Sequence, residues 1–388
     1  MSKSIQLKVP LNRVEGDLRV KVTIEDGVVS DAWSSGIMYR GFENLLVGRG
    51  PLDGLVLTPR ICGICGTAHL TAAAQALEMI QGVSPPPAAV RLRNIAMAVE
   101  KVQSDLRHTF LMFAPDFTNS LYRSSPFFEE ANKRYAPLKG ATAVEAVRQT
   151  RDLLEVIAFI GGQWPHSSYM VPGGNTSIPT SGELVQCQYR VDRFRDWYEK
   201  QILGCSLDRW ERLQNADDLD QWLEEDEQQE QSEIGLLIRF CRLHGLDRVG
   251  RGYGNYISFG TPLVESRDAG VESISGAAFA TASGVETLDQ AQISEYVDHS
   301  WYMDYAGGRH PFEGETRPDA TEQEGRKYSW AKAPRYRDQP VETGPLAELM
   351  IGDHPLITDL VRRDGPSAML RQLARLIRSA ILLRAIEY

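Results

Sequence analysis

The residues whose spacing most directly suggests chemistry are two cysteines in the segment TPRICGICGTAHL, residues 58–70. Cys62 and Cys65 are separated by two residues, each is followed by glycine, and His69 comes four residues after the second cysteine. Thiolates bind soft metals or exchange as disulfides, and glycines let the backbone approach a bound ion closely. The segment therefore predicts a metal or redox site.

Three kinds of site compete for this cysteine pair. A structural zinc site needs four ligands, usually two such pairs, whereas Cys187, Cys205 and Cys241 are single and scattered, and we interpret these three as buried packing cysteines. A thioredoxin-like redox pair would lie in a βαβ setting, which the surrounding sequence does not show. The third possibility is half of a thiolate-rich transition-metal site, which suits nickel and iron.

The elements that must position the pair are mainly helical. Alternating apolar residues over 18–24 and the turn Asp26-Gly27 predict a small N-terminal antiparallel sheet. Strong helix-forming residues predict a helix over 70–80, and apolar residues at helical spacing predict a long core helix over 85–113. The segment over 143–162, stopped by Gly161-Gly162, is interpreted as another core helix. We therefore predict an α+β fold, a small N-terminal antiparallel sheet on a helical-bundle core, as one domain over residues 1–388.

The apolar stripe of the helix over 85–113 consists of Ile95, Val99, Val102, Leu106, Phe110 and Phe113. A last helix after residue 364 carries a second stripe: Met369, Leu373, Leu376, Ala380 and Leu383. The acidic segment LEEDEQQEQSE, residues 223–233, is typical of a solvated helix or loop. Glycine and aromatic residues over 251–345 favour irregular structure laid over the bundle.

The overall charge and composition exclude several classes of protein. The net charge of −10 argues against nucleic acid as a partner. No run of eighteen apolar residues occurs, so no direct membrane span is expected. The N-terminus has no secretory signal, and five cysteines in a chain of this length indicate a reducing compartment. These observations predict a cytoplasmic protein, with any membrane association made through partners.

Several segments together resemble the large subunit of [NiFe] hydrogenases. Their residue patterns are most similar to those of the cytoplasmic uptake class. The pattern R-x-C-G-x-C-x-x-x-H over 60–69 resembles the family's first metal-binding motif, and RVEGDLRV over 13–20 its R-[IV]-E-G strand. Similar segments are MYRGFENLLVGRGP, GGQWPHSSYMVPGG, HSWYMDYAGGRHPFEGETRP and KYSWAKAPRYRDQPVETGPLAE. The likeness runs from about residue 8 to the last residue.

The resemblance implies a role for each matching residue. Cys62 would be a terminal thiolate on nickel, and Cys65 would bridge nickel and iron. Glu15 would relay protons, and Glu43 would help to bind Mg²⁺, a hard cation that prefers oxygen. His69 would lie near Cys65 outside the ligand set.

Other interpretations of these residues stay open. From the residues alone, Glu15 and Glu43 could be ordinary surface carboxylates. His166 could lie near an electron-transfer partner or be a buried core histidine. Arg335 is interpreted as a structural salt-bridge residue. Asp17 stands where the family often has histidine.

The resemblance further implies a Ni–Fe centre with diatomic ligands on iron, an iron–sulfur small subunit as partner, maturation factors, and H2 as substrate. The family site needs four thiolates, two of them from a C-terminal D-P-C-x-x-C, and this chain has no second CxxC after residue 65. We expect a C-terminally truncated large subunit that alone does not turn over H2. The alternative is a short, non-catalytic paralogue that acts as a maturation scaffold.

Overall fold

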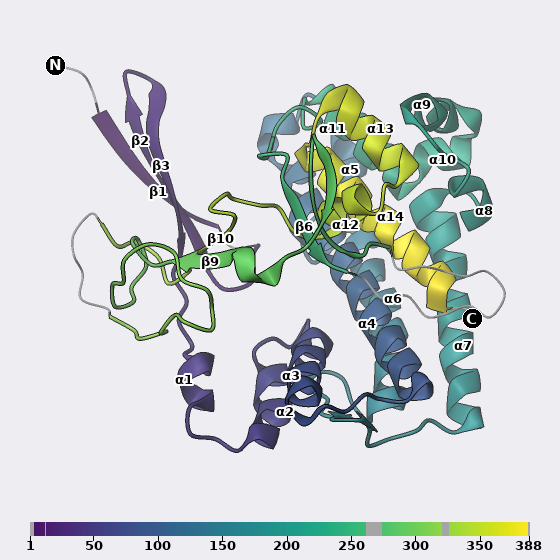
Figure 1. Ribbon diagram of the computed structural model, residues 1–388. Coiled ribbons are helices and arrows are strands. Elements are labelled where there is room, and N and C mark those ends of the chain that lie inside the picture. The colour runs from purple at the N-terminus through teal and green to yellow at the C-terminus, as the bar shows by residue number, and fades with distance from the viewer. Residues whose placement is uncertain (1–3, 12, 261–273, 320–325, 387–388) are drawn as a thin grey trace. The chain divides into compact units, whose positions relative to one another are not determined.

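The computed structural model describes residues 4–11, 13–260, 274–319 and 326–386. Within them the chain forms two compact units, and each unit is built from two separate segments (Figure 1). Unit 1 comprises Met1–Val47 and Asp289–Val341, and unit 2 comprises Gly48–Leu288 and Glu342–Tyr388. The single domain over 1–388 stays a prediction.

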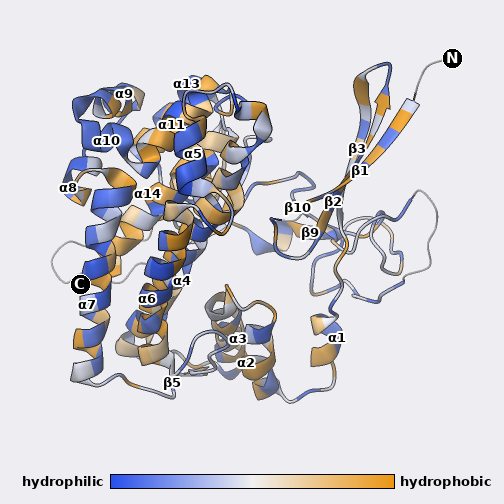
Figure 2. Ribbon diagram, turned by 180° about the vertical axis from the view of Figure 1, so that it is seen from behind, coloured by the Kyte–Doolittle hydropathy of each residue, from blue (hydrophilic) through white to orange (hydrophobic). Residues whose placement is uncertain are grey.

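Unit 1 begins with the antiparallel sheet that the alternating residues predict. Its strands are β1 (Ser4–Leu11), β2 (Leu18–Glu25) and β3 (Val28–Gly36), in the order β1-β2-β3. Asp26 and Gly27, both at positive φ, form the predicted turn between β2 and β3. Apolar residues lie opposite one another on β1 and β2, and the banding of β1 in Figure 2 shows its alternation.

The rest of unit 1 is short and irregular. It contains α1 (Phe42–Leu46), a 3₁₀ turn (Gln290–Gln292) and the paired strands β9 (Ile293–Tyr296) and β10 (Ala333–Tyr336). The backbone N–H of Trp330 donates to the carbonyl oxygen of Gly36 at 2.7 Å, and the Trp330 ring stacks on Tyr39 with ring centroids 4.4 Å apart. Residues 289–341 thus belong with the N-terminal sheet, which corrects their assignment to the bundle.

Unit 2 is a helical bundle with small sheets. Its helices are α2 (Gly54–Leu57), α3 (Gly66–Gln81), α4 (Pro87–Arg107), α5 (Phe128–Tyr135), α6 (Ala141–Gly161), α7 (Ser181–Trp197), α8 (Leu207–Trp210), α9 (Ala216–Glu225), α10 (Glu227–Gln231), α11 (Glu233–Leu243), α12 (Pro345–Ile351), α13 (Pro355–Asp364) and α14 (Ala368–Ile386). Its strands are β4 (Met170–Val171), β5 (Gly174–Asn175), β6 (Tyr256–Phe259), β7 (Ala277–Thr281) and β8 (Gly284–Thr287). Segments of π-helix extend α4 (His108–Phe113) and α7 (Tyr198–Leu203).

The predicted stripe on the helix over 85–113 forms part of the core. Val99, Val102, Leu106 and Phe110 are buried, and Ile95 and Phe113 at the stripe's ends are half-buried and pack against the same cluster. The predicted fold class, α+β with a small N-terminal antiparallel sheet and a helical-bundle core, is confirmed. No helix in the described residues is both long enough and apolar enough to cross a lipid bilayer.

Two expectations about the bundle are corrected. A missing C-terminal part would be expected to leave the apolar stripe of the last helix uncovered, but Met369, Leu373, Leu376, Ala380 and Leu383 are all buried. The cause is that α14 (yellow in Figure 1) packs against several helices of its own unit, namely α4, α11, α12 and α13. The unit therefore covers this stripe by itself.

The acidic segment over 223–233 is also only partly solvated. Glu233 at its end is completely buried, and its carboxylate accepts hydrogen bonds from the Tyr135 hydroxyl at 2.5 Å, Thr142 Oγ1 at 2.6 Å and Gln201 Nε2 at 3.0 Å. Arg134 adds an ion pair at 3.2 Å. Buried carboxylates need such partners, so Glu233 joins α11 to α5 and α6.

Candidate metal centre

The Cys62–Cys65 loop of unit 2 lies directly before α3, and Cys65 is the N-cap residue of that helix. The backbone N–H of Cys65 donates to Cys62 Sγ at 3.3 Å. Both cysteines are half-buried and form no disulfide. A helix N-terminus attracts negative charge, so the position suits the charge that a metal-bound thiolate carries.

The GGQWPHSS segment lies against this loop. His166 has positive φ, and its Nδ1 lies 2.9 Å from the carbonyl oxygen of Pro59, so that nitrogen donates. A Cβ atom placed on Gly63 would lie 3.6 Å from the His166 ring, and one on Gly66 would lie 3.2 Å from the oxygen of Pro59. The contact at Gly66 is tighter than side chains usually make, whereas a Cβ on Gly63 would make an ordinary contact with the His166 ring.

His69 lies one turn along α3 from Cys65, and its backbone N–H donates to the Cys65 carbonyl oxygen at 3.4 Å. Burial lowers the pKa of His69, so its imidazole is neutral at pH 7. The carbonyl oxygen of His69 accepts a hydrogen bond from Thr58 Oγ1 at 3.2 Å. The loop and the first turn of α3 are thus joined on both sides of the cysteines.

Two side chains of α4 that the sequence did not single out hold the other side of the loop. The carboxylate of Glu100 accepts hydrogen bonds from the N–H groups of Thr67 and Ala68, and Gln103 Nε2 donates to the carbonyl oxygen of Ile64. Both side chains are buried. Their position among the apolar residues of α4 is the sequence feature that could have indicated a buried polar contact.

The three remaining cysteines do not join the pair. Cys187 and Cys241 are buried, as predicted, and burial raises the pKa of the Cys187 thiol to about 11 and that of Cys241 further. Cys205 is half-buried and accepts a hydrogen bond from Trp222 Nε1 at 3.3 Å. Their packing role is confirmed for Cys187 and Cys241.

The side chains of the Cys62–Cys65 loop supply part of the ligand set of a Ni–Fe centre. Two thiols at a helix N-terminus, in a loop whose glycines allow close approach, fit one half of a thiolate-rich site. In the part of the chain that the structure describes, no group of three or more Cys, His, Asp or Glu side chains could hold a metal ion. The described residues therefore fit two ligands of such a centre.

Glu15 lies in the connection between β1 and β2 of unit 1, and its side chain is exposed. The following residues, Gly16 and Asp17, both have positive φ, and the carbonyl oxygen of Asp17 accepts a hydrogen bond from the N–H of Ile37 at 3.0 Å. The turn that carries Glu15 is thus fixed to the end of β3. Its proposed proton role stays a prediction.

Glu43 lies in the first turn of α1, also in unit 1. Burial and the nearby charges of Glu43 and Glu295 raise the pKa of Tyr302 to about 12. Glu295 is paired with Lys332 Nζ at 2.9 Å, and Lys332 also donates to Thr316 Oγ1 at 2.9 Å. The Glu43 side chain is exposed, and its role as a Mg²⁺ ligand stays a prediction.

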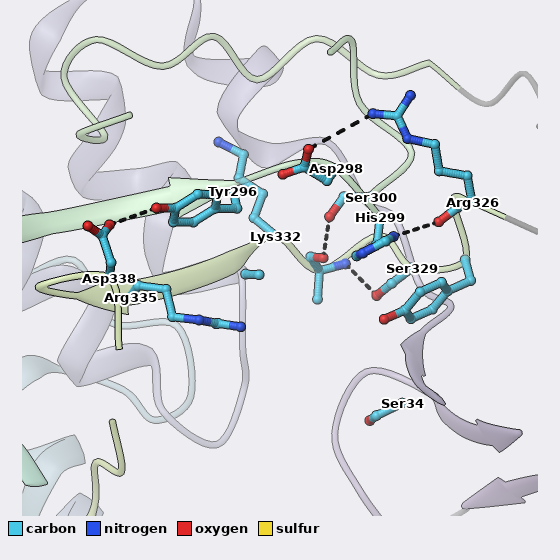
Figure 3. Close-up of a pocket in the computed structure, with 13 residues that line it drawn as sticks. Ser34, Tyr296, Asp298, His299, Ser300, Arg326, Ser329, Lys332, Arg335 and Asp338 are labelled. Atoms are coloured by element: carbon cyan, nitrogen blue, oxygen red, sulfur yellow. Dashed lines mark hydrogen bonds and ion pairs between the residues drawn. The ribbon is translucent and has the colours of Figure 1, made fainter. Parts of the chain in front are cut away.

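A cavity of about 560 Å³ lies in unit 1 beside β9 and β10 (Figure 3). Arg335 lines it, and its Nη1 donates to the carbonyl oxygen of Pro334 at 2.8 Å. The described residues contain no ion pair for Arg335, so the salt-bridge interpretation is not supported. On the same wall the Tyr296 hydroxyl donates to Asp338 at 2.6 Å.

Comparisons with known proteins agree with the family resemblance of the sequence. The family model described as nickel-dependent hydrogenase matches residues 40–132 and 233–385. The large subunit of a periplasmic [NiFeSe] hydrogenase from Desulfomicrobium baculatum is 31% identical over 88% of this chain. The chain spans only 63% of that relative's length. The uptake hydrogenase large subunit of Rhizobium leguminosarum bv. viciae is 27% identical, with 88% of this chain and 67% of that protein covered.

Solved structures show the same similarity in three dimensions. The Ni-Fe-Se hydrogenase from D. vulgaris Hildenborough in the reduced state superposes with a TM-score of 0.77 at 28% identity, covering 99% of this chain and 78% of that one. The H2-activated [NiFeSe] hydrogenase of Dm. baculatum gives a TM-score of 0.79 at 26% identity, with the same coverage. The fold prediction is confirmed by these matches.

Proposed function

Because the chain belongs to the nickel-dependent hydrogenase family, we propose that it is the large subunit of an uptake [NiFe] hydrogenase that oxidises H2 heterolytically. The observation that carries the proposal is the Cys62–Cys65 loop at the N-terminus of α3, with its N–H···S hydrogen bond. The relative from Rhizobium named as an uptake hydrogenase supports the direction of the reaction. The partner would be an iron–sulfur small subunit, assembled with maturation factors.

In this proposal Cys62 and Cys65 would hold the Ni–Fe centre, and the centre when bound would supply the redox chemistry for splitting H2. The Cys65 N–H stabilises negative charge on Cys62 Sγ. The hydrogen bond from His166 to the Pro59 carbonyl oxygen helps to hold the loop, and with it the two thiols, in place. Glu15 would take up at its carboxylate a proton released when H2 is oxidised. Glu43 would supply one oxygen to Mg²⁺.

Location is part of the same proposal. We place the chain in the cytoplasm, with membrane association through partners. The support is its composition and its similarity to the uptake class. The Desulfomicrobium relative is named as periplasmic, so cell fractionation with a tagged small subunit is the direct test.

The experiment produces the chain with a small subunit and maturation factors, with and without the C-terminal segment of a close relative. Nickel and iron content and H2-dependent dye reduction are measured. The extended wild type should contain both metals and oxidise H2. Cys65→Ser should lose the metals, whereas the matched buried control Cys187→Ser should keep them.

Two results would redirect the proposal. Iron bound without nickel or H2 oxidation, in the extended form too, would favour the maturation scaffold. Tight one-to-one zinc binding that needs both cysteines would contradict a Ni–Fe site.

Glu15→Gln tests the proton role, because glutamine keeps the shape but exchanges no proton at neutral pH. It should leave metal content normal and remove most hydrogen–deuterium exchange; full turnover would contradict the role.

A further inference from the structure

The N-cap position of α3 is filled by a cysteine, a residue that is not among the usual capping side chains. Ser, Thr, Asp and Asn normally accept a hydrogen bond there from the second or third N–H of the helix. Cys65 makes no capping hydrogen bond with its side chain. The N–H groups of Thr67 and Ala68 therefore need an acceptor from elsewhere in the fold.

Glu100 of α4 supplies that acceptor. Its Oε2 accepts from the N–H of Thr67 at 3.0 Å, and its Oε1 accepts from the N–H of Ala68 at 3.1 Å. The residue is only 3% exposed. A carboxylate with both oxygens engaged by a helix N-terminus fixes the position and direction of that end of the helix. The thiol of Cys65 is thereby relieved of the capping role.

Gln103 acts on the same loop one helical turn further along α4. Residues three apart on a helix lie on one face, so Glu100 and Gln103 point to the same side. Gln103 Nε2 donates to the carbonyl oxygen of Ile64 at 3.1 Å, and the side chain is completely buried. One acceptor and one donor of α4 thus hold the residues on either side of Cys65.

We propose that Glu100 and Gln103 form a bracket that sets the geometry of the Cys62–Cys65 thiol pair for metal binding, and that Glu100 is its principal positioning residue. Glu100 and Gln103 bind the backbone of Thr67, Ala68 and Ile64 and make no hydrogen bond to either thiol, so they act on the thiols through the loop. This inference rests on the proposed function, because it assumes that the cysteine pair binds metal. It adds two residues, distant in sequence from the motif, to the metal centre.

The test uses the full chain, prepared without metal under anaerobic conditions, and Co²⁺ as the probe. Thiolate-bound Co²⁺ gives charge-transfer and d–d absorption bands that report affinity and geometry. In Glu100→Gln the side-chain NH2 faces an N–H donor, so one of the two hydrogen bonds is lost. We expect Co²⁺ affinity to fall about 10–100-fold, as for changes behind metal ligands, with altered d–d bands.

The matched control is Glu233→Gln, which changes another buried glutamate of the same unit at a site remote in sequence from the cysteines. Its carboxylate accepts hydrogen bonds from Tyr135, Thr142 and Gln201. This variant should lower the melting temperature at least as much as Glu100→Gln, but leave Co²⁺ affinity and bands unchanged. The comparison separates positioning of the thiols from general destabilisation.

The outcomes are distinct. Wild-type affinity and bands in Glu100→Gln would overturn the inference and leave the proposed function standing. No thiolate band in the wild type, with Cys65→Ser indistinguishable from it, would instead overturn the metal pair itself and the inference with it. If Glu100→Gln does not fold, Gln103→Leu carries the test, since it removes only the bond to Ile64. Unchanged Co²⁺ binding in that variant would then overturn the bracket.

Discussion

Arg378 of α14 is the residue whose replacement we expect to damage unit 2 most clearly. Its guanidinium binds the Asp105 carboxylate with two hydrogen bonds, of 2.8 and 2.7 Å, and donates to Glu348 at 2.9 Å. All three residues are at most 9% exposed. One cation thus joins α14 to α4 and α12. We consider the variant Arg378→Met, which keeps much of the volume and removes the charge.

The size of the effect follows from what the variant leaves behind. Asp105 loses its bidentate partner while it stays buried, and breaking a buried pair in this way costs about 3–5 kcal/mol. Replacing both partners by apolar residues is much milder. We therefore expect the double variant Asp105→Leu/Arg378→Met to recover much of the stability that Arg378→Met loses.

The loss should also depend on pH. Burial raises the pKa of Asp105, and the charge of Arg378 opposes that rise. Without Arg378 the folded-state pKa lies still further above the unfolded value, so the folded form binds the proton more tightly. The contribution of Asp105 to the stability of Arg378→Met is then fully present at acidic pH and is lost as the pH rises through its folded-state pKa.

The assay is urea unfolding followed by tryptophan fluorescence, with the midpoint measured at several pH values. Arg384→Met is the matched control on the same helix, because Arg384 pairs with the exposed carboxylates of Asp208 and Glu211. Surface pairs contribute about 0–1 kcal/mol. An Arg378→Met variant no less stable than Arg384→Met, or a double variant worse than the single, would refute this reasoning.

Three other predictions concern local features. Gly235→Ala should lower the free energy of unfolding by about 1–3 kcal/mol, because a Cβ there would overlap the carbonyl oxygen of Gln229. The control Gly182→Ala, in an open position of α7, should leave the melting temperature nearly unchanged when both variants are compared by thermal unfolding. Burial lowers the pKa of His108 to about 4, so stability should fall as the pH drops from about 6.5 towards 4, and His108→Gln should flatten that slope in pH-dependent unfolding. Thr180→Ala removes the capping box of α7 and should lower stability by about 1 kcal/mol, measured as a shift of the urea midpoint.

Local patterns predicted the elements whose residues interact with near neighbours. The alternation over 18–24 and the Asp26-Gly27 turn place β2 and β3 correctly, because a hairpin is determined by adjacent residues. The stripe from Val99 to Phe110 predicts the buried face of α4, because burial follows helical periodicity. The cysteine pair was found for the same reason, since motif and helix start lie within a few residues.

What the sequence could not predict depends on contacts between distant residues. Glu100 reaches the cysteine helix across 33 positions, and Arg378 reaches Asp105 across 273. Neither pairing has a local signal. The buried Glu233 was misinterpreted for the same reason, because its acidic neighbours favour solvent while its partners come from α5, α6 and the π-helical segment after α7.

The two-segment construction of unit 1 has a consequence for biosynthesis. A ribosome releases β1, β2 and β3 early, but the backbone partner of Gly36 is Trp330, and the hydroxyl that Gly36 N–H binds belongs to Ser329, 293 positions later. Domains generally fold as units while the chain emerges, so the nascent sheet must wait while all of residues 48–288 are translated. During that interval the carbonyl oxygen and the N–H of Gly36 lack the partners that Trp330 and Ser329 supply. Unit 1 can therefore be completed only after residue 341 has left the ribosome.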